Sequence, residues 1–312
     1  MKKQKASDTN QWTILNLLKW ATGYLKKNGI EESKTTAEIL LAHSLHLQRI
    51  DLYLQHDRPL EKQELSQFKT LLKRKMQREP VAYITGDREF WSLPIAVTRD
   101  VLIPRPETER LAEAALDVIK GRTTDQGLRV LELGTGSGAL IIALAFEHEN
   151  VEFYASDISL KALAVAKQNA TGHGLKNIQF FAGNWMAPLS TAAEGFDMIL
   201  SNPPYIRRNE MERLAPEIRL YEPRSALDGG EDGLRELRHI VQNARAYLKP
   251  GGHLLLEIGY DQKADVMAIV TACGQYQSVR VFKDYGGHDR VLQLQRGAAG
   301  DKTHPSAPAL HR

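Results

Sequence analysis

The stretch of this 312-residue chain best suited to chemistry is Ser201-Asn202-Pro203-Pro204-Tyr205. It directly follows an apolar run at 196–200, which has the length and composition of a buried strand. Proline lacks a backbone N–H and fixes φ at about −65°, so two consecutive prolines end the strand in a stiff turn. The carboxamide oxygen of Asn202 and the backbone carbonyl of Pro203 can then accept both hydrogens of an –NH₂ group, while Tyr205 covers its flat face. The stretch predicts a site for a planar amino or amide nitrogen, although a proline turn with an incidental asparagine would have the same sequence.

A glycine-rich loop, Gly134-Thr135-Gly136-Ser137-Gly138, follows another apolar strand at 128–133. Glycines at such a turn let the backbone approach a ligand closely, at the carboxyl edge of a parallel sheet. The string also satisfies G-x-G-x-x-A, so a nicotinamide or flavin dinucleotide is a competing ligand. Two features argue against a dinucleotide. Glu132 would repel a pyrophosphate but suits an amine or a sulfonium, and Gly138 gives a G-x-G-x-G spacing, which resembles motif I of S-adenosylmethionine-dependent methyltransferases.

Two more predicted strands end in side chains suited to a nucleoside. Asp157 follows the strand at 151–156, where a carboxylate can accept hydrogen bonds from ribose hydroxyls or cap the helix that begins near Leu160. Asn184-Trp185 follow the strand at 177–181, where the indole can stack on an adenine ring or pack against the protein. Because the carboxyl ends of parallel strands open at one edge of a sheet, we expect these side chains to meet Asn202 there.

The elements that must position these residues alternate between strand and helix from Leu128 onward, which predicts a mostly parallel sheet covered on both faces. We expect strands at 128–133, 151–156, 177–181, 196–200, 252–258, 277–283 and 290–296. We expect helices near 138–147, 160–172, 232–247 and 261–272.

The chain before this sheet has a different pattern of apolar residues. Residues Trp12 to Arg78 show helical spacing of apolar residues and predict a small helical bundle. The β-branched and aromatic stretches 81–86 and 90–97, with Gly86-Asp87 between them, predict a β-hairpin that links two domains. A proline-rich lead-in at 102–109 then introduces a helix through 111–119.

Composition limits the class of protein. The chain is 42% hydrophobic and 25% charged, as in a soluble globular protein, and its net charge of +3 is too small to indicate nucleic-acid binding. The single cysteine, Cys273, excludes an internal disulfide and fits a reducing compartment. His43 and His46 lie one turn apart without a third ligand, so we expect no metal site. Without a signal peptide or a membrane span, we expect a cytoplasmic protein with a disordered tail at 297–312.

Over roughly residues 12–296 the chain resembles the bacterial peptide-chain release factor glutamine N5-methyltransferases, the HemK/PrmC family. The matching stretches are Glu79-Pro80-Val81-Ala82-Tyr83-Ile84-Thr85-Gly86, Glu89-Phe90-Trp91, Val101-Leu102-Ile103-Pro104-Arg105-Pro106-Glu107-Thr108-Glu109, Leu133 to Gly138, Asp157-Ile158-Ser159, and Ser201 to Ile206. Asn-Pro-Pro-Tyr alone is shared with DNA adenine-N6 methyltransferases and some rRNA enzymes. The stretch Arg105 to Glu109 is typical of the methyltransferases that act on release factors.

The resemblance implies an α/β fold with a seven-stranded, Rossmann-like class I methyltransferase domain whose last strand is antiparallel. It implies a helical bundle at 1–79 that recognises release factors, a β-hairpin linker at 80–100, a catalytic domain at 101–296 and the tail at 297–312. The implied activity is transfer of a methyl group from S-adenosylmethionine to the glutamine of the Gly-Gly-Gln loop of class I release factors, which modulates translation termination.

The resemblance also implies roles for individual residues. S-adenosylmethionine would be held by Gly134, Thr135, Gly136, Ser137, Gly138, Asp157, Trp185 and Asn202. The substrate glutamine would be held by Asn202, Pro203, Pro204 and Tyr205, with Asn202, Pro203 and Tyr205 acting in catalysis. Asn184 departs from the acid that many members carry at this position.

Two alternatives remain from the sequence. An N6-adenine methyltransferase acting on DNA or RNA would use the same turn and would bind nucleic acid in a salt-dependent way. A nicotinamide oxidoreductase would leave residues 202–205 without a role. From the resemblance we expect a monomer that needs no metal, acts on release factors and has no direct nucleic-acid or membrane partner.

Overall fold

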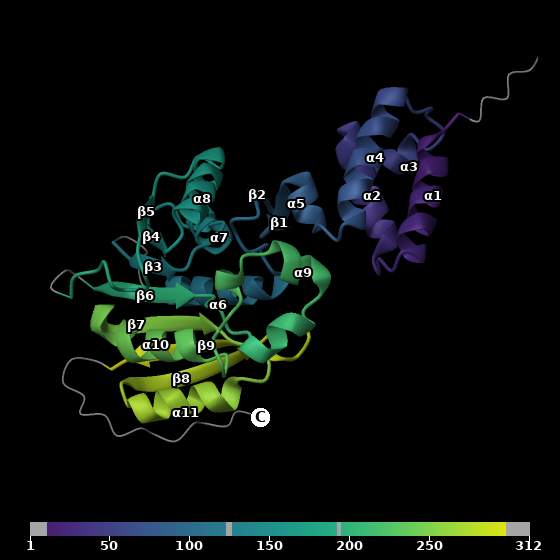
Figure 1. Ribbon diagram of the computed structural model, residues 1–312. Coiled ribbons are helices and arrows are strands. Elements are labelled where there is room, and N and C mark those ends of the chain that lie inside the picture. The colour runs from purple at the N-terminus through teal and green to yellow at the C-terminus, as the bar shows by residue number, and fades with distance from the viewer. Residues whose placement is uncertain (1–10, 123–126, 192–194, 298–312) are drawn as a thin grey trace, which may run out of the picture. The chain divides into compact units, whose positions relative to one another are not determined.

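The computed structural model describes residues 11–122, 127–191 and 195–297 (Figure 1). Its internal contacts divide the chain into two compact units, Met1–Gly86 and Asp87–Arg312, each with a hydrophobic core of its own. The tail expected to be disordered lies almost entirely outside the described residues. Within the described ranges, no helix has the length and apolar character needed to cross a membrane.

The first unit is helical, as its apolar spacing predicts. Its helices are α1 (Ile14–Lys27), α2 (Ser33–Leu45), α3 (Asp51–Leu54), α4 (Lys62–Met76) and α5 (Val81–Thr85). Thr13 caps α1 by accepting a hydrogen bond from the Asn16 backbone amide, and a capping box of Glu61 and Glu64 begins α4. The core side chains include Leu25, Leu40 and Phe68, which are almost completely buried.

The predicted strand at 81–86 is wrong: this stretch forms helix α5. Pro80 precedes the helix, and Gly86 ends it in the left-handed conformation with φ of 90°. The Arg74 guanidinium donates hydrogen bonds to the carbonyl oxygens of Tyr83 (3.0 Å) and Ile84 (3.2 Å), in the last turn of this short helix. Burial of Tyr83 and Ile84, together with this long-range pairing, overrides their β propensity.

The hairpin is therefore shorter and begins later than predicted. Strand β1 (Asp87–Phe90) pairs antiparallel with β2 (Leu93–Ala96). Trp91 and Ser92 form the two-residue turn, both with positive φ, as a type I′ hairpin turn requires. By its contacts the hairpin belongs to the second unit.

The second unit is built on a seven-stranded sheet of order β5-β4-β3-β6-β7-β9-β8. Neighbouring strands from β5 to β7 are parallel, and β9 is antiparallel to both of its neighbours, which confirms the expected class of sheet. The strands are β3 (Arg129–Leu133), β4 (Glu152–Asp157), β5 (Ile178–Ala182), β6 (Phe196–Ser201), β7 (Leu248–Glu257), β8 (Tyr276–Lys283) and β9 (Asp289–Arg296).

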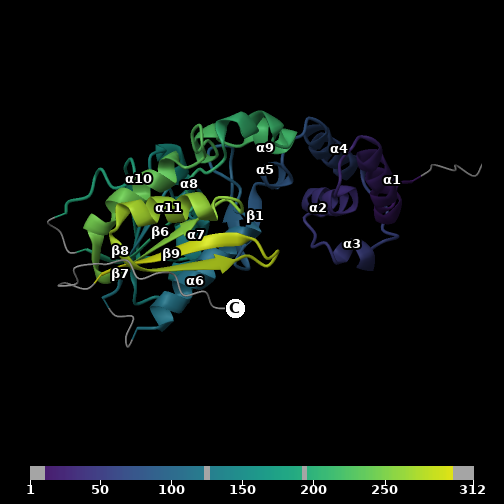
Figure 2. The ribbon, with the colours of Figure 1, turned by 90° about the horizontal axis from the view of Figure 1, so that it is seen from below.

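Helices cover both faces of this sheet. They are α6 (Glu109–Lys120), α7 (Ala139–Glu147), α8 (Leu160–Gly172), α10 (Arg235–Asn243) and α11 (Lys263–Cys273). Figure 2 shows α10 and α11 on one face and α6 on the other. Successive strand residues point to opposite faces, so Val130 joins the core under α6 and α7 whereas Leu131 joins the core under α10 and α11.

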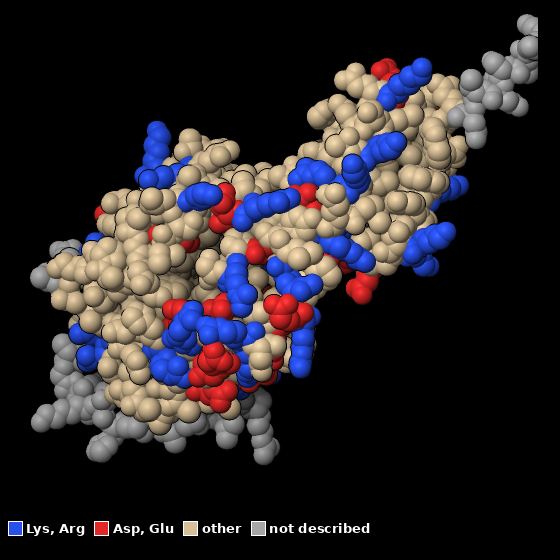
Figure 3. Space-filling view, viewed as in Figure 1, with Lys and Arg blue, Asp and Glu red and all other residues tan. Residues whose placement is uncertain are grey.

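Residues 202–234, between β6 and α10, contain short helices that the sequence did not predict. They are η2 (Arg208–Arg213), α9 (Pro216–Tyr221) and η3 (Arg224–Ala226). Arginine–carboxylate pairs are frequent here, among them Arg207–Asp261 at 2.7 Å and Arg219–Glu212 at 2.9 Å. Figure 3 shows the resulting mixture of basic and acidic side chains over this part of the second unit.

Candidate active site

Two adjoining cavities open at the carboxyl edge of the sheet. The larger one, of about 720 Å³, is lined by the glycine loop after β3, by Asp157 at the end of β4 and by Trp185 after β5. The smaller one, of about 380 Å³, is lined by Pro203 and Tyr205 after β6. Leu102, Asn202 and Ala226 line both cavities. Strands β3 and β6 are neighbours where the strand order reverses, which is the usual ligand position in such sheets.

The glycine loop is built for close approach of its backbone to a ligand. Gly134, Gly136 and Gly138 all have positive φ, between 57° and 81°. A Cβ atom on Gly138 would lie only 3.1 Å from the side chains of Ala166 and Ile142, so a larger residue would push the loop off α8. Gly134 and Gly136 line the larger cavity.

The other two residues of the loop are turned toward the protein. Thr135 and Ser137 are buried, and neither is among the described residues that line the cavities. The Thr135 hydroxyl donates to the Glu132 carboxylate at 2.5 Å, and the Ser137 carbonyl accepts a hydrogen bond from Asn169 at 2.8 Å. These contacts of Thr135 and Ser137 with the protein interior stabilise the loop.

Asp157 ties the glycine loop to the start of α8. Its Oδ2 accepts a hydrogen bond from the Gly136 amide at 2.9 Å, and its Oδ1 accepts one from the Ser159 amide at 2.8 Å. The residue that caps α8 is Ser159, whose hydroxyl accepts a hydrogen bond from the Ala162 amide. Each Asp157 oxygen can accept a further hydrogen bond, and Asp157 lines the larger cavity.

Trp185 lies beside the glycine loop in the same cavity. A Cβ atom on Gly134 would lie 3.4 Å from its ring, and its Nε1 donates to Glu236 at 2.8 Å. Trp185 has a positive φ of 51°, an uncommon conformation for a residue with a large side chain. Neighbouring Asn184 also lines the cavity.

The turn after β6 contains two acceptors for which the described residues supply no donor. The Asn202 side-chain nitrogen donates to the Thr108 hydroxyl at 3.1 Å. Among the described residues, none donates a hydrogen bond to the Asn202 side-chain oxygen or to the Pro203 carbonyl. Asn202 and Pro203 both line the smaller cavity, and the sequence-based expectation that they accept an –NH₂ group stays a prediction.

A glutamine supports the turn through hydrogen bonds, and two glycines allow the neighbouring chain to pack closely against it. Gln262 is almost completely buried and donates to the carbonyl oxygens of Tyr205 (2.9 Å) and Gly233 (3.1 Å). A Cβ atom on Gly229 would come within 2.8 Å of the Pro204 carbonyl, and one on Gly233 within 2.5 Å of the Tyr205 carbonyl. The sequence did not indicate these supports, because their only signal is a Gly-Gly pair and a glycine three residues later.

Carboxylates hold the proline-rich lead-in in place, and one of them, Glu222, is buried. The side chain of Glu222 is 1% exposed, and it accepts hydrogen bonds from the Arg105 guanidinium (2.5 Å) and the Ile103 amide (3.2 Å). Glu109 accepts one from the Trp91 amide at 3.0 Å, while Glu107 lines the smaller cavity. The Arg-Pro-Glu-Thr-Glu stretch thus forms part of the cavity walls and anchors them.

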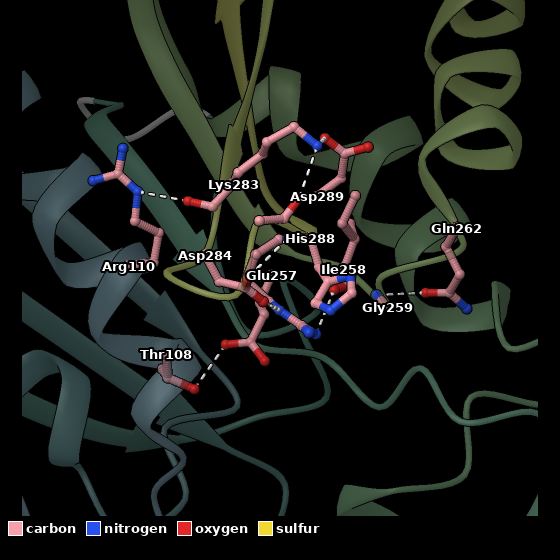
Figure 4. Close-up of polar contacts among 12 residues, drawn as sticks. Thr108, Arg110, Glu257, Ile258, Gly259, Gln262, Lys283, Asp284, His288 and Asp289 are labelled. Carbon is pink, nitrogen blue, oxygen red and sulfur yellow. Dashed lines mark hydrogen bonds and ion pairs between the residues drawn. The ribbon is translucent and has the colours of Figure 1, made fainter.

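A second buried carboxylate, Glu257, joins the lead-in to the turn. It accepts hydrogen bonds from the Thr108 hydroxyl at 2.7 Å and the Tyr205 hydroxyl at 3.2 Å. Figure 4 shows Thr108 and Glu257 facing each other. Burial raises the pKa of Glu257 to about 7, and burial also raises the pKa of Tyr205, so the tyrosine is a neutral donor. The sequence did not indicate Thr108 or Glu257 as members of the site.

Glu132 behaves differently from the expectation that it faces a cationic ligand. It is 3% exposed and is not among the described residues that line the cavities. Burial raises the pKa of Glu132 to about 8, with Asp157 adding to the increase and the Thr135 hydroxyl opposing it.

This pKa predicts how the stability of the protein depends on pH. Between the ordinary glutamate pKa of about 4.3 and the raised value, the folded state binds more protons than the unfolded state, so the free energy of unfolding falls as pH rises. We expect Glu132→Gln to reduce this slope by up to about 1.4 kcal/mol per pH unit between pH 5 and pH 8. Urea unfolding across that range measures it. A variant with an unchanged slope would mean that Glu132 stays ionised in the folded protein.

Comparison with known proteins identifies the family. A family profile described as the PrmC N-terminal domain matches residues 16–86, and one described as a methyltransferase domain matches residues 124–288. The release factor glutamine methyltransferase of Vibrio cholerae is 44% identical over 89% of this chain and 95% of its own length. The enzyme of the same name from Geobacter sulfurreducens is 41% identical over 90% and 96%, respectively.

Among solved structures, the hMettl16 catalytic domain in complex with the MAT2A 3′UTR hairpin 6 is similar with a TM-score of 0.53. At 16% identity, covering 80% of this chain and 88% of that one, it shows a common fold alone. The two sequence relatives cover nearly the whole chain, and their names match the expectation drawn from the turn, the glycine loop and the Arg-Pro-Glu-Thr-Glu stretch. The chain therefore belongs to the release factor glutamine methyltransferase family.

Proposed function

We propose that this protein transfers a methyl group from S-adenosylmethionine to the side-chain amide nitrogen of the glutamine in the Gly-Gly-Gln motif of class I peptide chain release factors. The observation that carries the proposal is the position of Asn202, which lines both cavities with its oxygen unpaired. A donor in the larger cavity and an acceptor in the smaller one would meet at this residue. By changing the Gly-Gly-Gln loop, the reaction would modulate translation termination.

The larger cavity suits S-adenosylmethionine. Its volume of about 720 Å³ lies within the usual range for sites of small molecules. The backbone of Gly134 and Gly136 can approach the ligand closely, Asp157 can accept hydrogen bonds from ribose hydroxyls, and the Trp185 ring offers a flat surface for adenine. S-adenosylmethionine supplies a methyl group bound to a positively charged sulfur. Thr135, Ser137 and Gly138 would act by shaping the loop.

The smaller cavity suits the side chain of a glutamine. An amide nitrogen is a poor nucleophile because its lone pair is delocalised into the carbonyl. Asn202 and Pro203 would accept its two N–H bonds through their side-chain and backbone oxygens, which leaves the lone pair facing the larger cavity. As the nitrogen becomes positive, these fixed dipoles stabilise the charge. Tyr205 and Pro204 restrict the orientation of the substrate amide plane. The proton leaves to water after transfer.

The protein partner is inferred from the family and from the separate helical unit. Every residue assigned above to the cofactor or the glutamine lies in the second unit. We assign the first unit to recognition of the release factor, a large substrate that needs a surface beyond the cavities. In this proposal the enzyme acts as a monomer in the cytoplasm, where release factors work.

Mass spectrometry of a purified release factor tests the proposal. After incubation with the protein and S-adenosylmethionine, we expect one added methyl group, located by peptide fragmentation on the glutamine of Gly-Gly-Gln. A release factor with that glutamine replaced by alanine is the matched control and should gain none. Methyl transfer to adenine in DNA or RNA, with none to the release factor, would contradict the proposal and support the N6-adenine alternative.

Asp157→Ala is expected to weaken S-adenosylmethionine binding about 10- to 150-fold, which corresponds to the roughly 1.5–3 kcal/mol of a hydrogen bond to a charged group. The carboxylate also accepts the Gly136 amide, so part of the effect comes from a looser loop. Isothermal titration calorimetry measures the affinity, and a melting curve of the variant controls for damage to the fold. Unchanged affinity in Asp157→Ala would exclude a role for this residue in binding.

A further inference from the structure

We propose that Glu257 is a positioning residue for methyl transfer, because through Thr108 it fixes which end of the Asn202 carboxamide faces the substrate. This inference rests on the proposed function, in which the Asn202 oxygen accepts a hydrogen bond from the substrate nitrogen. It concerns a residue that is not among the described lining residues of either cavity.

The geometry begins with a carboxyl group at the end of β7. Glu257 is 0% exposed, and each of its oxygens accepts one hydroxyl. Oε2 accepts the Thr108 hydroxyl at 2.7 Å, and Oε1 accepts the Tyr205 hydroxyl at 3.2 Å. One buried group therefore binds the lead-in segment, through Thr108 (Figure 4), and the turn after β6, through Tyr205, at the same time.

The direction of these hydrogen bonds determines the orientation of Asn202. An ionised carboxylate can only accept, so Thr108 must donate its single hydroxyl hydrogen to Glu257. The Thr108 oxygen then presents only lone pairs to Asn202, 3.1 Å away. Asn202 must meet them with its –NH₂ group, which turns its oxygen to the other side. An amide in the opposite orientation would present a donor to the substrate nitrogen, which needs an acceptor.

The cost of burying Glu257 supports a role beyond packing. Among the described residues, no ion pair is made with Glu257, although Arg290 contributes attraction and Glu107 contributes repulsion. Arg290 itself pairs with Asp284 at 3.2 Å and donates to the Ile258 carbonyl at 3.1 Å. A buried acid without a direct ion pair costs free energy that an apolar residue would not. Burial raises the pKa of Glu257 to about 7.

Protonated Glu257 would no longer fix the direction of the hydrogen bonds from Asn202 through Thr108 to Glu257. A protonated carboxyl group can donate to Thr108, whose hydroxyl is then free to donate to the Asn202 oxygen. The charged or titratable groups around Glu257 are Arg290, Glu107 and Tyr205, and the first two oppose each other. We therefore expect kcat to fall as pH drops below about 7.

Glu257→Gln tests the inference in the full-length protein, because glutamine has the same shape but offers a donor on one side. At pH 8 we expect kcat for the release factor to fall about 10- to 100-fold, the range for losing outer groups that orient ligands in metal sites. The KM for the release factor and the affinity for S-adenosylmethionine should change less than about threefold, since Glu257 touches neither cavity. The decline of kcat below pH 7 should disappear.

Two further comparisons separate orientation from general support of the fold. In an Asn202→Ala background, Glu257→Gln should have almost no additional effect on kcat, because no amide is left to orient. Thr108→Val, which keeps the shape and removes the hydroxyl, should lower kcat at least about 10-fold more than Thr108→Ser. If Glu257→Gln does not fold, the two Thr108 variants still decide the question.

The outcomes distinguish failure of the positioning role from failure of the proposed function. If the unmodified protein methylates the release factor and Glu257→Gln keeps its kcat, the positioning role is wrong and the proposed function stands. Additive losses in the double variant would also overturn it. If the unmodified protein does not methylate the release-factor glutamine, the proposed function fails, and the positioning role fails with it.

Discussion

Asn202→Ala is expected to lower kcat for release-factor methylation on the order of 10²–10³-fold, or about 3–4 kcal/mol. The Asn202 oxygen has no other described donor and lies where the two cavities meet. Its hydrogen bond to the substrate nitrogen strengthens as that nitrogen becomes positive, so the loss falls on the transition state. Removal of a single preorganised donor from an oxyanion hole has an effect of this size. There a donor stabilises a developing negative charge, whereas here an acceptor stabilises a developing positive charge.

The measurement is kcat and KM for an intact release factor, together with the affinity for S-adenosylmethionine. Pro203 and Pro204 keep the turn rigid without the Asn202 side chain, and Gln262 still holds the Tyr205 carbonyl, so both affinities should change little. Asn243→Ala, which removes an exposed amide from α10, is the control and should behave as the unmodified protein. A normal kcat with a raised KM would mean that Asn202 only binds substrate, and the mechanism would have to be abandoned.

The sequence predicts the sheet and its functional edge because both depend on local patterns. Apolar runs of strand length alternate with helical spacing, so each strand of the sheet was expected within a few residues of its observed bounds. The glycine loop, Asp157 and the turn at Asn202 each follow a parallel strand directly. Their convergence at one edge follows from the connectivity alone, without knowledge of any side-chain contact.

The supports of the site could not be predicted, because they join residues far apart in the chain. Arg105 and Glu222 are separated by 117 positions, and Thr108 and Glu257 by 149. A buried glutamate at the end of an apolar strand gives no indication of its partner. Tertiary contacts also explain the error at Val81–Thr85, where the decisive residue is Arg74 in the preceding helix. The short helices at 208–226 lack apolar periodicity, so no pattern indicated them.

Removal of the first unit, residues 1–86, is expected to lower kcat/KM for an intact release factor at least about 30-fold, which corresponds to losing one interface residue of about 2 kcal/mol. The boundary at Gly86 separates two units with their own cores, so the second unit should fold alone. Both cavities are lined entirely by described residues of that unit. The affinity for S-adenosylmethionine should therefore stay within about twofold of the full-length value, and circular dichroism and a melting curve confirm that the truncated protein is folded.

A short peptide that contains Gly-Gly-Gln provides the matched control for this truncation. Such a peptide reaches the smaller cavity but offers no large surface to the first unit, so the truncated and full-length proteins should methylate it at equal rates. The ratio of kcat/KM for the release factor to kcat/KM for the peptide separates recognition from chemistry, because the methyl-transfer step is common to both substrates. If a folded truncated protein loses peptide and release-factor activity to the same extent, the first unit contributes to the methyl-transfer site itself. If it methylates the release factor as well as the full-length protein does, recognition resides in the second unit, and the role assigned to the helical unit is wrong.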